Sequence, residues 1–305
     1  MAELTAGEQR TEVEKPTSGF RLFVARYAER KLSVVALVVL IGVVLVAYVG
    51  PVFTPQNPFD LAQIDILDNM LPPGSESMTG MTYWLGTDDQ GRDLVSAIVY
   101  GLRISLTVGV LSGFLAVIIG CVAGITAAYA GGWGERIIMR TVDLFLGFPS
   151  FLIALICLAV LGRGVDKVLF ALVLSQWANF ARVIRSVAVI EREKEYMSAA
   201  GGLMLPRHRI IFRHLLPNCL PPLIVVATVN VAFSITLEAS LSFLGVGLPV
   251  TEPSLGLLIA NGYEYIITGD YWLSVYPGIA LVVTIGSINL VADRLRDILN
   301  PRNDQ

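Results

Sequence analysis

The sequence predicts an all-α integral membrane protein with six transmembrane helices. Of its 305 residues, 54% are hydrophobic and only 15% are charged, and the mean hydropathy is +0.68. A soluble domain does not need this much apolar sequence to build its core. Apolar runs long enough to cross about 30 Å of hydrocarbon as helices occur at 32–53, 104–129, 142–161, 168–189, 220–244 and 272–292.

The fourth run, 168–189, is the weakest of the six because polar side chains interrupt it. Gln176, Asn179, Arg182 and Arg185 fall within it, and charged residues are costly at the bilayer centre. A five-span alternative, in which the polar end of this run lies in the cytosol, stays open.

The Lys and Arg residues predict the orientation of the chain. Cytosolic flanks of membrane helices retain these residues. With the N-terminus inside, the outer segments contain only Arg92, Arg103, Arg163 and Lys167, and all other Lys and Arg fall in segments on the cytosolic side. We therefore expect both termini and the polar loop 191–218 to be cytosolic.

Alternation of polar and apolar segments predicts four parts of the chain. The second part includes a short interfacial helix, because Thr87 and Gln90 have the spacing of a helix-capping box. The parts are a cytosolic tail with an amphipathic surface helix at 1–31, the first span and an outer loop with the interfacial helix at 32–103, a core of five spans containing loop 191–218 at 104–297, and a cytosolic tail at 298–305.

Glycines at helical spacing predict a packing surface on the second span. Gly109, Gly113, Gly120 and Gly124 share one helical face. Small residues let helix backbones approach closely in lipid. We expect this face to contact another helix, and the alternative is that it lines a substrate path.

No motif in the sequence predicts chemistry carried out by this chain. A phosphate-binding loop ends in Gly-Lys-Ser/Thr, and no lysine here follows a glycine. Cys121, Cys157 and Cys219 are scattered in or beside the spans, which supports neither a disulfide framework nor a metal site. We expect no enzymatic activity, and no metal or cofactor bound by this chain.

Loop 191–218 is the most informative polar segment. Its first part favours a helix with small residues, Pro206 breaks that helix, and Ile210, Ile211, Leu215 and Leu216 give a second short helix an apolar stripe. We expect Pro217 to end the second helix. Such a helix-turn-helix either lies on lipid headgroups or inserts into a soluble partner.

The loop sequence EYMSAAGGLMLPRHRIIFRHLLPN resembles the EAA loop of permease subunits of ABC importers. Four more stretches resemble the C-type permease subunit of dipeptide and oligopeptide importers in particular. They are WLGTDDQGRDLVSAIVYGLRISL at 84–106, RIIMRTVDLFLGFPSFLIAL at 136–155, EASLSFLGVGLP at 238–249 and VYPGIALVVTIGSINLVADRLRDILNPR at 275–302.

The resemblance implies a six-helix permease of the type I importer fold in a bacterial inner membrane. Its implied partners are a homologous second permease, two ATPase subunits that bind ATP and Mg, and an extracytoplasmic peptide-binding protein. The loop would dock into the ATPase. The residues that the resemblance assigns to this coupling are Glu195, Tyr196, Ser198, Ala199, Ala200, Gly201, Gly202, Arg209, Arg213 and Pro217.

Two positions in the loop depart from the EAA pattern. The usual Glu is replaced by Ser198, and the usual Gly is replaced by Met204. We expect one ion pair with the ATPase to be weakened, and Gly201 and Gly202 to supply the bend between the two short helices.

Polar residues in the fifth span are candidates for the substrate path. Ionisable groups within spans are costly and are often functional. Asn230, Ser234 and Glu238 are such candidates, and pairing of Glu238 with a neighbouring helix is the alternative. Non-peptide solutes such as nickel chelates or glutathione, a self-sufficient transporter, an exporter and a membrane-embedded scaffold remain alternative functions.

Overall fold

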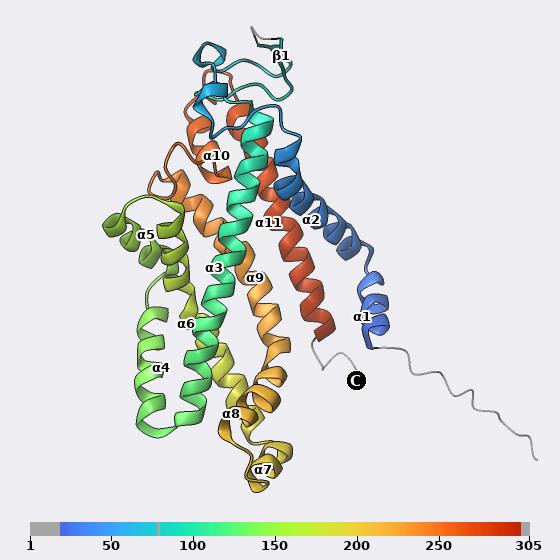
Figure 1. The fold of residues 1–305 in the computed structure, drawn as a ribbon, viewed down its shortest axis with the longest axis vertical. Helices are drawn as coiled ribbons and strands as arrows, with labels where there is room; N and C mark the ends of the chain where they lie inside the picture. The colour runs from blue at the N-terminus through green and yellow to red at the C-terminus, as the bar shows by residue number, and fades with distance from the viewer. Residues whose placement is uncertain (1–18, 78–79, 300–305) are drawn as a thin grey trace, which may run out of the picture.

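A long helix, α3, runs through the middle of the molecule and contacts helices on several sides (Figure 1). The structure is a computed structural model that describes residues 19–77 and 80–299, so the predicted tails at 1–18 and 300–305 lie outside it. The α-helices are α1 (Gly19–Ala28), α2 (Lys31–Val49), α3 (Leu94–Ala130), α4 (Gly132–Leu146), α5 (Ser150–Leu161), α6 (Val165–Arg192), α7 (Glu195–Gly202), α8 (Arg207–Ile210), α9 (Leu216–Phe243), α10 (Leu255–Tyr263) and α11 (Trp272–Leu299).

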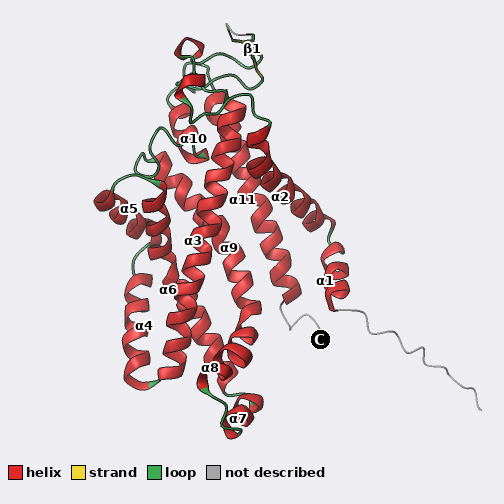
Figure 2. Ribbon diagram, viewed as in Figure 1, coloured by secondary structure: helices red, strands yellow, loops and turns green. Residues whose placement is uncertain are grey.

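The remaining elements are short and gather mainly in the segment between α2 and α3 (Figure 2). Strands β1 (Ser75–Glu76) and β2 (Thr82–Tyr83) pair antiparallel, with Ser75 opposite Tyr83. The other short elements are the 3-10 turns η1 (Gly50–Val52), η2 (Leu61–Gln63) and η3 (Ile66–Asp68), and the π turn η4 (Ile211–Leu215).

The described chain has five helices that are long and apolar enough to cross a membrane, or six if the bent pair α4 and α5 counts as one span. The run predicted to be weakest, 168–189, lies inside the continuous helix α6. The break is in the third run instead, where α4 and α5 meet at 86°. Pro149 accounts for it, because proline disfavours the helical conformation of the preceding residue and cannot donate an amide hydrogen bond.

The second span begins differently from the prediction. Helix α3 starts at Leu94, and its N-cap is Asp93, whose Oδ2 accepts hydrogen bonds from the Ser96 amide and hydroxyl at 2.8 and 2.6 Å. Thr87 is not a cap, because its hydroxyl donates to the Asp68 carbonyl at 2.6 Å. The predicted interfacial helix is therefore not a separate element.

The glycines of α3 lie where its backbone approaches two different helices. A Cβ placed on Gly120 would overlap Phe180 of α6, and one placed on Gly124 would overlap the Ala181 carbonyl. On the preceding turns of α3, a Cβ on Gly109 would overlap Ile235 of α9. Gly113 differs, because a Cβ there would lie 3.5 Å from Val231, an ordinary contact.

The turn after α7 places a methionine in a conformation that favours glycine. Met204 has φ 54°, and the Leu205 amide donates to the Ala200 carbonyl at 3.4 Å, which is the long hydrogen bond of a Schellman helix end. Gly201 and Gly202, which were expected to supply the bend, lie inside α7 instead. The left-handed conformation costs an L-residue about 1–2 kcal/mol.

We predict that Gly120→Ala lowers the free energy of unfolding by about 1–3 kcal/mol, because the added methyl overlaps α6 backbone and Cβ atoms. Thermal unfolding of the purified protein in detergent measures the change. Gly113→Ala is the matched control, since its methyl group has room and should leave the midpoint almost unchanged. Equal midpoints for both variants would contradict the close α3–α6 contact.

We predict that Met204→Gly stabilises the turn by about 1 kcal/mol, because glycine adopts positive φ without strain. The Met204 side chain is 91% exposed, so its removal sacrifices little packing. Slower hydrogen exchange of the Leu205 amide is the expected result. Met204→Ala removes the same side chain but keeps a Cβ, and should give no slowing. A similar slowing in both variants would refute a backbone origin.

Candidate functional site

Loop 191–218 forms a knob at one end of the molecule, where α7 and α8 project beyond the neighbouring helices (Figure 1). Its tip carries large apolar side chains in the open. Leu203, Met204 and Phe212 are 75%, 91% and 69% exposed. An exposed apolar tip of this kind is typical of a surface that another molecule covers.

Helix α7 has two distinct faces. Met197 and Ala200 point into a core cluster that includes Leu215 of η4 and Cys219 of α9. Glu195, Ser198, Ala199 and Gly202 are exposed on the other face, and a Cβ on Gly202 would meet no atom within 4 Å. The two alanines therefore do not form one outward patch, as the sequence suggested. Ala199 faces out, and Ala200 serves the chain's own core.

A hydrogen-bonded network joins α7 to the ends of two long helices. The Tyr196 hydroxyl donates to Glu191 Oε2 of α6 at 2.8 Å and accepts from Asn218 Nδ2 of α9 at 3.0 Å. Lys194 Nζ lies 2.5 Å from Glu191 Oε1. Sequence reasoning missed Glu191, although a carboxylate five residues before a tyrosine was the available signal.

The surroundings of Tyr196 keep its hydroxyl protonated. Burial, together with the hydrogen bond to the neighbouring Glu191 carboxylate and its charge, raises the pKa of Tyr196 to about 12. The hydroxyl is therefore a proton donor to Glu191 throughout the physiological pH range. This donor holds the start of α7 against the end of α6.

The second half of the loop continues directly into α9. Pro217 does not end a helix, as predicted, but lies in the first turn of α9. The π turn η4 directly precedes it, and this wider turn accommodates a residue that cannot donate an amide hydrogen bond. Arg209 and Arg213 are exposed and form no ion pair with any residue in the part of the chain described.

The candidate path residues of α9 face into the protein. Glu238 is fully buried, accepting hydrogen bonds from Ser105 of α3 at 3.0 Å and from Ser242 at 2.7 Å. Ser234 is also fully buried and donates to Gln176 Oε1 of α6 at 2.9 Å. Asn230 is partly buried. In this structure Ser234 and Glu238 link helices and do not border open space.

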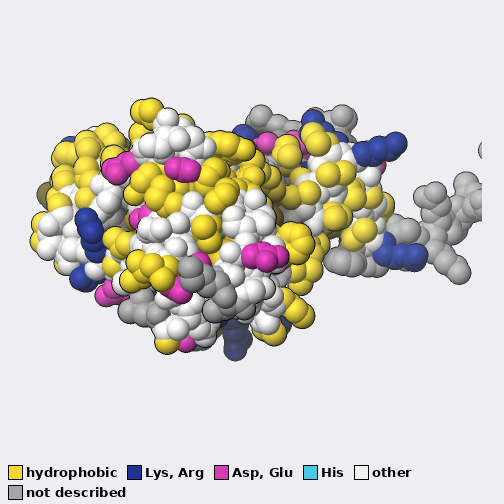
Figure 3. Space-filling model, turned by 90° about the horizontal axis from the view of Figure 1, so that it is seen from above, with side chains coloured by type: hydrophobic (Ala, Val, Ile, Leu, Met, Phe, Trp, Pro, Cys, Tyr) yellow, Lys and Arg dark blue, Asp and Glu magenta, His cyan; other side chains and the backbone are white. Residues whose placement is uncertain are grey.

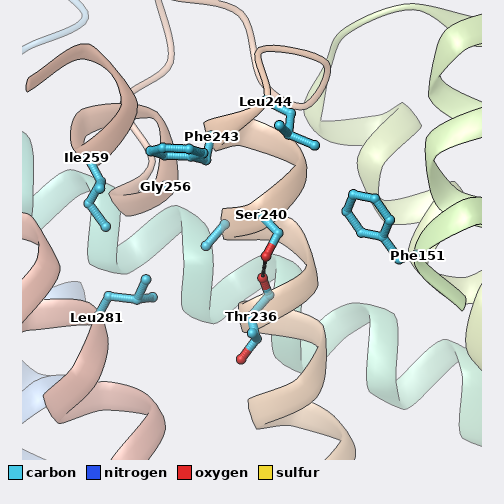
Figure 4. A pocket seen from close by; sticks show the side chains of 9 residues that line it. Phe151, Thr236, Ser240, Phe243, Leu244, Gly256, Ile259 and Leu281 are labelled. Carbon is cyan, nitrogen blue, oxygen red and sulfur yellow. Dashed lines mark hydrogen bonds between the residues drawn. The ribbon is translucent and has the colours of Figure 1, made fainter. Parts of the chain in front are cut away.

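A different face of α9 borders an open pocket of about 520 Å³ (Figure 4). Thr236 and Ser240 supply its hydroxyl groups, and the Ser240 hydroxyl donates to the Thr236 carbonyl at 2.8 Å. Apolar side chains from α5, α10 and α11 surround them, among them Phe151, Ile259 and Leu281. The lining contains no charged side chain among its nine described residues.

The opposite end of the molecule from the knob carries acidic side chains spread among hydrophobic ones (Figure 3). One acidic residue there is buried in an ion pair, since Arg92 Nε lies 2.6 Å from Asp88 Oδ2 and both side chains are at most 5% exposed. Arg92 also donates to the Val250 carbonyl at 3.3 Å. This pair ties the segment before α3 to the α9–α10 connection.

Comparison with known proteins places these features in a family. Residues 116–305 match the family described as binding-protein-dependent transport system inner membrane component, and residues 18–73 match the N-terminal transmembrane domain of oligopeptide transport permease C.

Several relatives match nearly the whole chain. A Brucella suis protein, provisionally named a peptide transport system permease, is 37% identical over 91% of this chain and 90% of its own. The dipeptide transport system permease protein DppC of Alkalihalophilus pseudofirmus is 34% identical over 90% and 87%, and the oligopeptide transport system permease protein OppC of Bacillus subtilis is 30% identical over 99% and 95%.

The fold itself also has a counterpart of known structure. A chain from an inward-facing structure of the MetNI methionine ABC transporter superimposes on 66% of this chain and 96% of its own length, with a TM-score of 0.53 and 21% identity. The helices, the knob and the sequence matches agree, and the chain belongs to the family of inner membrane components of binding-protein-dependent transport systems.

Proposed function

We propose that this chain is the transmembrane permease subunit of an ATP-driven importer of dipeptides and oligopeptides. Loop 191–218 couples it to ATPase subunits. The observation that carries the proposal is the outward face of α7, where Glu195, Ser198 and Ala199 stand exposed on a helix anchored from behind. That anchoring lets a partner move α7 without unfolding it.

The shape of the loop supports docking into a groove of a protein. Ala199 and Gly202 leave the outer face of α7 low, so that a partner backbone can approach closely. Exposed Arg209 and Arg213 supply charge at its side, and Phe212 supplies an apolar contact. A loop lying flat on lipid would have less use for small residues on its outermost helix.

The anchoring supports a mechanism in which the loop drives two spans. Closure of the ATPase subunits around ATP would push α7, and the Tyr196 network would pass the displacement to α6 and α9. Alternating closure and release would then switch the permease between inward-open and outward-open states. ATP and Mg are bound by the partner subunits, and this chain contributes no catalysis.

The pocket beside α9 supports the assignment of half of a translocation path to this chain. A homologous second permease would supply the other half, and an extracytoplasmic binding protein would deliver the substrate. Hydroxyl groups and apolar walls without charge suit passage of peptides of varied sequence, because no fixed charge retains one kind of side chain. In this arrangement both termini and the knob are cytosolic.

We predict that Ala199→Glu abolishes co-purification of ATPase subunits from native membranes in mild detergent while the second permease is retained. The added carboxylate would clash with a closely fitting partner and lie one helical turn from Glu195. Ala62→Glu makes the same change at an exposed site between α2 and α3 and should retain every subunit. Absence of an ATPase from the wild-type preparation would overturn the importer assignment.

We predict that Tyr196→Phe leaves the complex assembled but reduces peptide uptake per ATP hydrolysed, by about fivefold if one hydrogen bond of about 1 kcal/mol transmits the motion. Uptake and hydrolysis measured together in proteoliposomes give this ratio. Tyr48→Phe removes a hydroxyl that contacts Thr107 at 3.0 Å, far from the loop, and should leave the ratio unchanged. Uptake of a nickel chelate or glutathione in place of peptides would reassign the substrate.

A further inference from the structure

A polar groove runs between α4 and α6, near the end of the molecule that carries the knob (Figure 1). Its volume is about 640 Å³. Gly132 and Met139 form part of its wall, and its remaining lining is charged: Glu135, Arg136, Asp143, Arg182 and Arg185. Neither the coupling loop nor the pocket beside α9 includes these residues.

The groove holds more positive than negative charge. Arg185 pairs with Glu135, and Arg182 Nη2 lies 2.6 Å from Asp143 Oδ1. The third arginine, Arg136, instead lies over the Trp133 ring at 4.8 Å and forms no ion pair with any residue that the structure describes. One positive charge in the groove is therefore left for an outside anion.

An exposed apolar stripe on α4 begins beside that charge. Trp133, Ile137 and Leu144 are 74%, 63% and 61% exposed, and Phe148, just past the end of α4, is 59% exposed. On the helix, Arg136 and Arg140 border this stripe on the side that faces the groove. The arrangement places a cation at one end and an apolar track leading away from it.

The chemistry that fits both features together is that of a phospholipid. Arginine forms strong, directional hydrogen bonds with phosphate oxygens, and tryptophan favours the boundary between hydrocarbon and headgroups. Basic pockets between membrane helices on the cytosolic side bind anionic headgroups. A zwitterionic headgroup would bring its own ammonium group toward the arginines, whereas an anionic one would not.

We propose that the α4–α6 groove binds the phosphate headgroup of an anionic phospholipid, with its acyl chains along Trp133, Ile137, Leu144 and Phe148. Arg136 is the principal phosphate ligand. The ion-paired Arg182 and Arg185 line the same groove and add positive potential. The site would hold a lipid whether or not the chain imports peptides, so it stands apart from the proposed function.

Native mass spectrometry of the purified transporter complex tests the proposal, with phosphatidylglycerol, phosphatidylcholine and inorganic phosphate added separately. We expect wild type to retain phosphatidylglycerol at least tenfold more tightly than the other two. Arg136→Gln should lose about fivefold in affinity for it, because one basic residue near an anionic surface contributes roughly that much. Arg136→Lys, which keeps the charge, should recover most of the loss.

Two further variants separate a lipid from a small anion and a specific site from general charge. Leu144→Ser should weaken phosphatidylglycerol without changing inorganic phosphate binding, since only the lipid uses the apolar stripe. Arg163→Gln removes an exposed arginine between α5 and α6, away from the groove, and should change nothing. Equal retention of phosphatidylglycerol by wild type and Arg136→Gln, or equal affinity for phosphatidylcholine or phosphate, would overturn the proposal.

Discussion

The close approach of α3 and α6 at Gly120 and Gly124 is the constraint on which the rest of the structure depends. Helices in a bilayer gain little from burying apolar surface against one another, because lipid is equally apolar. They associate where backbones can come close, and here two glycines one turn apart allow it. At the same end, Arg192 of α6 donates to the Ala128 carbonyl of α3 and lies 5.2 Å from the Tyr129 ring.

This contact determines where α6 ends, and therefore where the knob begins. Glu191, in the last turn of α6, receives the Tyr196 hydroxyl, and Asn218 of α9 holds the same hydroxyl from the other side. Met197 and Ala200 add apolar contacts behind α7. A helix of eight residues is too short to be stable alone, so these contacts make α7 a defined surface.

Much of the fold could be predicted from the sequence because apolar runs of sufficient length report membrane helices directly. The break at Pro149 was missed because a proline within an apolar run does not reveal whether the helix bends slightly or stops. The cap of α3 was placed at Thr87 because local spacing matched a capping box. Tertiary partners, namely the Asp68 carbonyl and the Leu71 amide, use the Thr87 hydroxyl instead.

Prediction of the site was less complete because side-chain direction depends on neighbouring helices. The position of the knob followed from its sequence, but the division of Ala199 and Ala200 between partner and core depends on where η4 and α9 lie. Glu238 attracted attention because a carboxylate inside a span is costly. Hydroxyl groups of Ser105 and Ser242 satisfy it, and only the second lies near enough in sequence to be anticipated.

The unbroken path from the knob into α9 has a mechanical consequence. Helical residues continue from Arg207 to Phe243, and these 37 residues form a rod of about 55 Å at 1.5 Å per residue. The knob occupies one end of this rod, and Ser240, on the wall of the open pocket, lies near the other. Helices gripping the middle make the rod a see-saw. A push on its cytosolic end swings the pocket wall the opposite way, with no chain of side-chain rearrangements between them.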